Sequence, residues 1–104
     1  MTTYMIFGLN SANLAEARVC VESALGVGME LHESDFRCGE YYRFGSVNSE
    51  HFILQRNFDH EEGEWTRGEF SDFAMLLYVN DTPRGAQIES VLMSTARLLA
   101  TQDL

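Results

Sequence analysis

The chain has 104 residues, 45% of them hydrophobic, and a formal net charge of −9 from sixteen acids and seven arginines, with no lysine. This length predicts a single domain over residues 1–104, whose core needs no disulfide or metal. The excess of acids argues against direct binding to nucleic acid or to an anionic membrane, because both need a basic surface. The charge fits a basic protein partner, or it serves solubility alone.

The cysteines and histidines match no known site motif. Cys20 and Cys38 are not a CxxC pair, and the spacing of the histidines fits neither HxH nor HExxH. We therefore expect no metal, no cofactor and no enzyme activity. Cys20 lies among apolar residues of an expected helix and is predicted to be buried. No signal peptide is visible and no segment reaches the ~20 apolar residues of a membrane helix, so we expect a cytoplasmic protein.

The first half of the chain predicts a strand, a helix and three further strands. Residues 4–9 are nearly all apolar and predict an interior strand. Asn13 followed by Glu16 resembles a capping box at the start of a helix that reaches about residue 25, where Gly26 suits the C-cap. Alternating polarity and turn residues then predict an antiparallel meander of three strands, near residues 29–36, 41–44 and 51–58.

The second half is organised around residues 73–79, a run of seven apolar residues that predicts a central strand buried on both faces. Residues 59–72, before this run, contain six acids, one tryptophan and two glycines, and predict a long loop of about a dozen residues. Loops of this length often carry function. After the run, Thr82 and Pro83 are a typical helix start, and apolar spacing predicts a helix to about Ala100.

These elements predict an α+β fold with the order β-α-β-β-β-β-α. A five-stranded, mainly antiparallel sheet is expected to carry both helices on one face, with the strands at residues 4–9 and 73–79 near its centre. Because both of these strands are apolar on both faces, the second face of the sheet should also be partly covered. The acidic loop or another protein is the expected cover.

Two acidic groups and their neighbours are the candidate contact surface. Trp65, in the acidic loop, is expected either to fold back onto the core or to serve as an interface anchor. Tyr41 and Arg43 share the outward face of their strand and are either a partner-binding pair or a solvated surface. The candidate binding residues are Glu61, Glu62, Glu64, Trp65, Glu69 and Asp72 in the loop, with Glu30, Glu33 and Asp35 on or after the second strand.

Several motifs in the middle of the chain resemble a known family. They are Leu25-Gly26-Val27 with Met29-Glu30-Leu31, Gly39-Glu40-Tyr41-Tyr42, Ile53-Leu54-Gln55-Arg56-Asn57-Phe58, the spaced acidic run, and Leu76-Leu77-Tyr78-Val79-Asn80. Over about residues 25–92 the chain resembles small bacterial immunity proteins of contact-dependent growth-inhibition systems. The resemblance implies a non-catalytic protein that binds the C-terminal domain of a cognate toxin, commonly a nuclease, and blocks its active site or substrate path.

The charge of the chain is consistent with that resemblance. An acidic surface on a rigid sheet can occupy the basic cleft of a nuclease in place of its substrate, and opposite fields speed the encounter. No single contact residue is carried over by the motifs, so the candidate residues rest on charge. The alternative interpretation is a small ferredoxin-like ligand-binding or regulatory domain that homodimerises through its sheet, in which the acidic loop has no special role.

Overall fold

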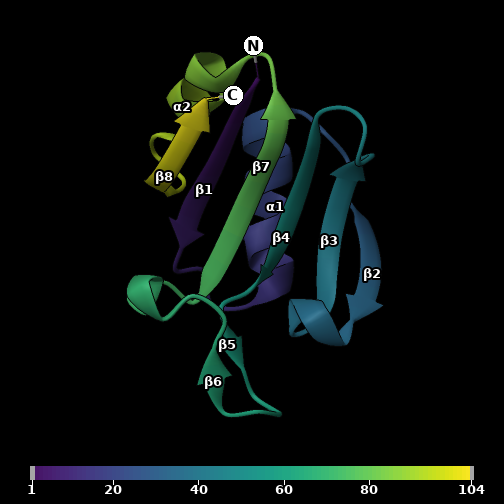
Figure 1. Cartoon of the computed structure of the whole chain (residues 1–104), viewed down its shortest axis with the longest axis vertical. Helices are drawn as coiled ribbons and strands as arrows, with labels where there is room; N and C mark the ends of the chain where they lie inside the picture. The colour runs from purple at the N-terminus through teal and green to yellow at the C-terminus, as the bar shows by residue number, and fades with distance from the viewer. Residues whose placement is uncertain (1, 104) are drawn as a thin grey trace.

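The computed structural model describes residues 2–103 as an α+β fold, in which two helices cover one face of a six-stranded antiparallel sheet (Figure 1). The strand order is β2-β3-β4-β7-β1-β8, and β5 pairs separately with β6. The elements are β1 (Thr3–Leu9), α1 (Leu14–Leu25), β2 (Glu30–Ser34), the 3₁₀ turn η1 (Asp35–Arg37), β3 (Gly39–Gly45), β4 (His51–Arg56), β5 (Phe58–Asp59), β6 (Glu64–Trp65), the 3₁₀ turn η2 (Gly68–Phe70), β7 (Met75–Thr82), α2 (Gly85–Leu92) and β8 (Arg97–Asp103).

The two most apolar strands lie inside the sheet, as predicted. β7 pairs with β4 and β1, and β1 pairs with β7 and β8. Leu77 and Val79 belong to the core beneath the helices, whereas Leu76 faces the opposite side and is also fully buried. The prediction that this strand is buried on both faces is therefore confirmed for residues 75–77 and for Val79, whereas Tyr78 is half-buried and Ala74 is exposed. We call the side opposite the helices the open face of the sheet.

Helix α1 begins and ends where its sequence predicts. The side chain of Asn13 accepts a hydrogen bond of 2.9 Å from the backbone N–H of Glu16, which satisfies one of the free donors of the first turn. Gly26 ends the helix with a left-handed φ of 68°, and its N–H donates to the carbonyl of Glu22. The buried side of the helix packs on the sheet through Leu14, Ala17 and Val21.

The C-terminal part of the chain corrects the predicted helix and the predicted strand count. Helix α2 ends at Leu92 instead of about Ala100, and residues 97–103 form β8, a sixth strand. The physical reason is the far edge of β1, whose backbone groups need partners that β8 supplies. Leu98 joins the core from this strand. Helix α2 also begins at Gly85, because Thr82 is still part of β7.

Two smaller predictions are also wrong. Cys20 is exposed and not buried, because the buried stripe of α1 runs through Ala17 and Val21 and leaves the thiol on the solvent side. The acidic segment at residues 59–72 is not one open loop. It contains most of the β5–β6 hairpin and the turn η2, whose backbone hydrogen bonds give the segment a defined shape.

A bidentate ion pair joins the residue before β4 to the connection between β7 and α2. The carboxylate of Glu50 accepts hydrogen bonds from Nε and Nη2 of Arg84 at 2.9 and 2.8 Å, and from Oγ1 of Thr82 at 2.6 Å. The bond from Arg84 is the main cause that lowers the pKa of Glu50 below its ordinary value, and desolvation opposes it in part.

We expect Glu50→Gln to lower the free energy of unfolding at neutral pH. The decrease of this free energy between neutral and acidic pH should also be smaller in the variant than in the wild type. Because the folded-state pKa of Glu50 is lowered, the carboxylate stabilises the fold above the unfolded-state pKa of about 4.3, and this contribution is lost as the pH falls through the folded-state value. Urea unfolding followed by circular dichroism from neutral pH to about pH 3 measures the effect. Glu89→Gln on the exposed side of α2 is the control, and an unchanged pH dependence in Glu50→Gln would contradict the prediction.

Candidate protein-binding site

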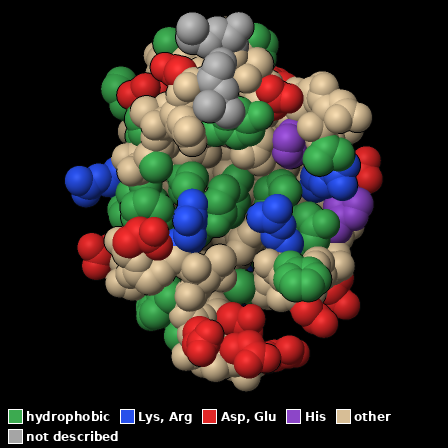
Figure 2. Space-filling view, viewed as in Figure 1, with side chains coloured by type: hydrophobic (Ala, Val, Ile, Leu, Met, Phe, Trp, Pro, Cys, Tyr) green, Lys and Arg blue, Asp and Glu red, His purple; other side chains and the backbone are tan. Residues whose placement is uncertain are grey.

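The acidic hairpin, residues 58–65, projects beyond the end of the main sheet (Figure 1). Its turn is shaped by Asp59, whose Oδ1 accepts the backbone N–H groups of Glu61 and Glu62 at 3.0 and 3.2 Å. Gly63 follows with a φ of 70°, a left-handed conformation that favours glycine. The side chains of Glu61, Glu62 and Glu64 are all exposed. Figure 2 shows the resulting group of carboxylates at the lower tip of the molecule.

The hairpin is fixed to the sheet by the side chain of Asn57, which is 0% exposed. Its Nδ2 lies 3.4, 3.0 and 3.1 Å from the carbonyl oxygens of Arg67, Phe70 and Phe73, and its Oδ1 accepts the N–H of Arg67 at 2.9 Å. The backbone N–H of Asn57 donates to the carbonyl of Ala74 at 2.8 Å. One amide therefore joins the end of β4, both ends of η2 and the start of the return to β7.

Trp65 combines the two roles that its sequence context left open. Its ring packs edge-on against Phe58, with 5.0 Å between the ring centroids. It also lines a shallow depression with Leu14 and Met75 at the start of α1 and β7. Even so, 42% of Trp65 remains exposed. The ring is thus supported by Phe58 beside the core and still offers a surface to a partner.

A notch of about 230 Å³ lies between the acidic hairpin and the turn η1. A hydrogen bond between Sγ of Cys38 and Oγ1 of Thr66, which are 3.0 Å apart, joins the two segments. The notch brings together members of both predicted acidic groups, with Arg56 as a basic neighbour. Its acidic lining residues are Glu33, Asp35, Asp59 and Glu61.

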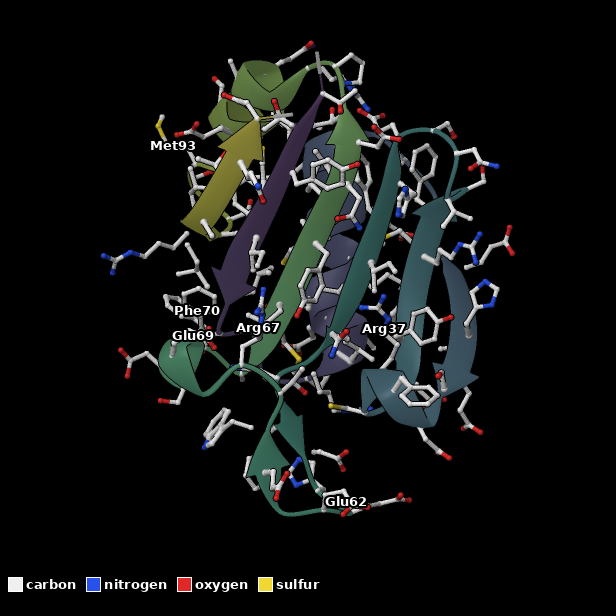
Figure 3. The ribbon with its side chains drawn as sticks, viewed as in Figure 1. Arg37, Glu62, Arg67, Glu69, Phe70 and Met93 are labelled. Carbon is white, nitrogen blue, oxygen red and sulfur yellow. The ribbon has the colours of Figure 1, made fainter. Side chains whose placement is uncertain are left out.

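The remaining predicted residues lie away from this notch. Glu30 lies at the edge of the open face, where its Oε2 is 3.8 Å from Nε2 of His32. Glu69 and Asp72 are exposed, on and just after η2. Figure 3 shows Glu69 pointing away from Glu62 on the other side of the hairpin base. The nine candidates are therefore divided among the hairpin and its notch, the η2 segment and one sheet edge.

Sequence reasoning missed two arginines on the open face. Arg37 extends from η1, with its Cζ 5.6 Å from the ring centroid of Tyr78, and its Nη1 donates to Oε1 of Gln55 at 3.0 Å. Arg67 extends from the hairpin base over the same face (Figure 3). One sequence signal was available, because Gln55 is a polar residue within an apolar strand and a buried amide needs a partner.

Two kinds of feature were sought within residues 2–103, a cluster of metal-ligating side chains and a helix that could span a membrane. In this range no three His, Cys, Asp or Glu side chains are grouped in a way that would hold a metal ion. Neither helix of the described chain has the length and apolar character needed to cross a membrane. Comparisons of the chain with protein-family models, curated proteins and solved structures gave no match.

We expect Asn57→Ala to destabilise the protein by about 2–4 kcal/mol, because it removes a fully buried amide that donates to three partly buried carbonyl groups and accepts the N–H of Arg67. Amide hydrogen exchange should accelerate most in residues 58–73, and urea unfolding measures the global loss. Asn48→Ala, in an exposed turn, is the matched control. A uniform rise in exchange across the sheet, with no excess in residues 58–73, would show that Asn57 does not anchor the hairpin.

Proposed function

We propose that this chain is a bacterial immunity protein that binds a cognate toxin domain and neutralises it by covering the basic active-site cleft of the toxin. The supporting observation is the concentration of exposed carboxylates on a hairpin whose base is fixed by Asn57. The motifs that resemble immunity proteins of contact-dependent growth inhibition support the same role. The proposal places the protein in the cytoplasm, where such a toxin acts.

In this role the hairpin acts as a substitute for a nucleic-acid backbone. A nuclease cleft holds phosphates with arginine and lysine, and carboxylates accept the same charge-assisted hydrogen bonds. Glu61 and Glu62 at the tip meet these cations, and the notch beside Glu33 and Asp35 has the charge to receive one basic side chain. Trp65 next to the tip supplies an apolar anchor.

The preformed shape of the hairpin favours tight inhibition. Its hydrogen bonds exist in the free protein, so less ordering entropy is lost on binding than for a flexible acidic loop. The opposite charges of the two proteins raise the association rate, up to ~10⁸–10⁹ M⁻¹s⁻¹ at low salt. Rapid capture suits a protein whose target kills the cell when free. Inhibition by occupation of the cleft requires no catalytic group in the inhibitor.

The direct test is a pull-down of the toxin domain encoded beside this chain, followed by a nuclease assay. We expect stoichiometric binding and inhibition that added nucleic-acid substrate relieves, because inhibitor and substrate compete for one cleft. Full nuclease activity in the presence of excess inhibitor would overturn the proposal.

We further expect charge reversal of the hairpin tip, Glu61→Arg/Glu62→Arg/Glu64→Arg, to weaken toxin binding by ~100-fold or more while the circular dichroism spectrum stays native. The three side chains are exposed, so their replacement disturbs no packing. Affinity should be measured by calorimetry at low and high salt, and the salt dependence should fall in the variant. For an equal change in net charge, the control Glu16→Arg/Glu89→Arg on the helices is compared with Glu61→Arg/Glu62→Arg, and an equal loss in both double variants would show that net charge alone matters.

A further inference from the structure

The open face of the sheet carries positive charge although the chain as a whole has a net charge of −9. Arg43 points to this face from β3, and Arg37 and Arg67 extend over it from η1 and the hairpin base. Among the acids near this face, Glu30 lies on the edge strand β2 and Glu69 of η2 lies 4.0 Å from Arg67. Figure 2 shows basic side chains on a hydrophobic background at the centre of this face, directly above the acidic tip.

The guanidinium groups of Arg37 and Arg67 are weakly neutralised within the chain. Within the described residues Arg37 makes no ion pair within 4.0 Å, and the pair of Arg67 with Glu69 is at 4.0 Å, with both side chains substantially exposed. Arg37 stacks on the ring of Tyr78, and Arg67 lines a shallow depression with Tyr4 and the same tyrosine. The two cations are thus available to carboxylates from outside.

The neighbouring side chains have the chemistry of a protein interface. Phe36, next to Arg37 in η1, is 95% exposed, which is unusual for an aromatic residue of a monomer. Tyr41 lies opposite Gln55 on the open face, beside the site where Arg37 docks. Aromatic residues and arginine dominate the binding energy of protein interfaces, so this part of the open face is suited to docking.

The charge pattern of this surface favours a second copy of the chain as the occupant. An acidic lobe beside a basic patch on one surface is self-complementary under a twofold axis, because each lobe meets the patch of the other copy. Full overlap of two open faces would oppose arginine to arginine. We therefore propose that two copies associate in an offset twofold arrangement, in which Glu61 and Glu62 of each copy pair with Arg37 and Arg67 of the other. This inference does not depend on the proposed function, although both use the carboxylates of Glu61 and Glu62, so a bound toxin domain would compete with the second copy.

Charge-reversed variants test the arrangement with the protein alone. In a dimer of Arg37→Glu/Arg67→Glu, the acidic face of each copy would meet the acidic hairpin of the other. In a dimer of Glu61→Arg/Glu62→Arg, the basic hairpin of each copy would meet the basic face of the other. We expect each variant alone to associate at least tenfold more weakly than the wild type in sedimentation experiments over a concentration series. A mixture of the two variants should restore association as a heterodimer, detectable by native mass spectrometry, since both contacts then join opposite charges.

The controls separate this surface from a general effect of charge. Glu16→Arg on α1 and Glu89→Arg on α2 change exposed charges on the helices, away from the open face, and should leave the association constant of the wild type unchanged. Because the contacts are exposed ion pairs, association should also weaken as salt rises from ~50 to ~500 mM. A wild type that stays monomeric at its highest soluble concentration overturns the proposal. So does a dimer that neither double variant weakens, or a mixture that does not form heterodimers.

Discussion

The amide of Asn57 is the constraint on which the shape of the acidic surface depends. β4 and β7 are neighbours in the sheet, yet the chain between them leaves the sheet for residues 58–73. In this segment some backbone carbonyl groups have no partner on a neighbouring strand. Carbonyl groups that are shielded from water need another hydrogen-bond donor. The side chain of Asn57 donates to the carbonyls of Arg67, Phe70 and Phe73, and its oxygen accepts the N–H of Arg67 in return.

This arrangement separates the part of the protein that provides stability from the part that provides contact. The core lies between the helices and one face of the sheet, around residues such as Phe7, Phe52 and Leu77. The acidic hairpin lies outside that core. The Asn57 amide fixes its base, and the rings of Phe58 and Trp65 line a depression with the core residues Leu14 and Met75. The exposed carboxylates of Glu61, Glu62 and Glu64 are therefore free of packing constraints, so a strongly acidic tip does not disturb the core of the domain.

Sequence patterns were sufficient where local chemistry determines the structure. The caps of α1 at Asn13 and Gly26 and the apolar strand around Leu76 depend on neighbours in sequence, and they were predicted correctly. β8 was not predicted, because it forms by pairing with the free edge of β1, and β1 is remote from it in sequence. The leucines at positions 98 and 99 fit a helical stripe as well as a strand, so periodicity alone could not distinguish the two.

The candidate site shows the same limit. Composition alone identified the acidic segment, but the meeting of Asp35 with Glu61 across the notch depends on how η1 folds beside the hairpin. The sequence could have predicted that Glu30 and Glu33 lie on opposite faces of the sheet. Residues an odd number of positions apart in one strand point to opposite faces. Arg37 and Arg67 could not be placed, because both reach the open face from segments outside the sheet.

The bond between Asn57 and Ala74 closes the hairpin segment at its base, so its two ends meet within 2.8 Å. Residues 58–73 thus behave as an insertion whose entry and exit are fixed by the scaffold. Changes of sequence or length near the tip should leave the register of β4 and β7 intact. That register is determined by the pairing of the two strands within the sheet, on the other side of the bond between Asn57 and Ala74. A scaffold of this kind can acquire new partners through sequence changes in one short segment, while selection for folding acts on the remainder of the chain.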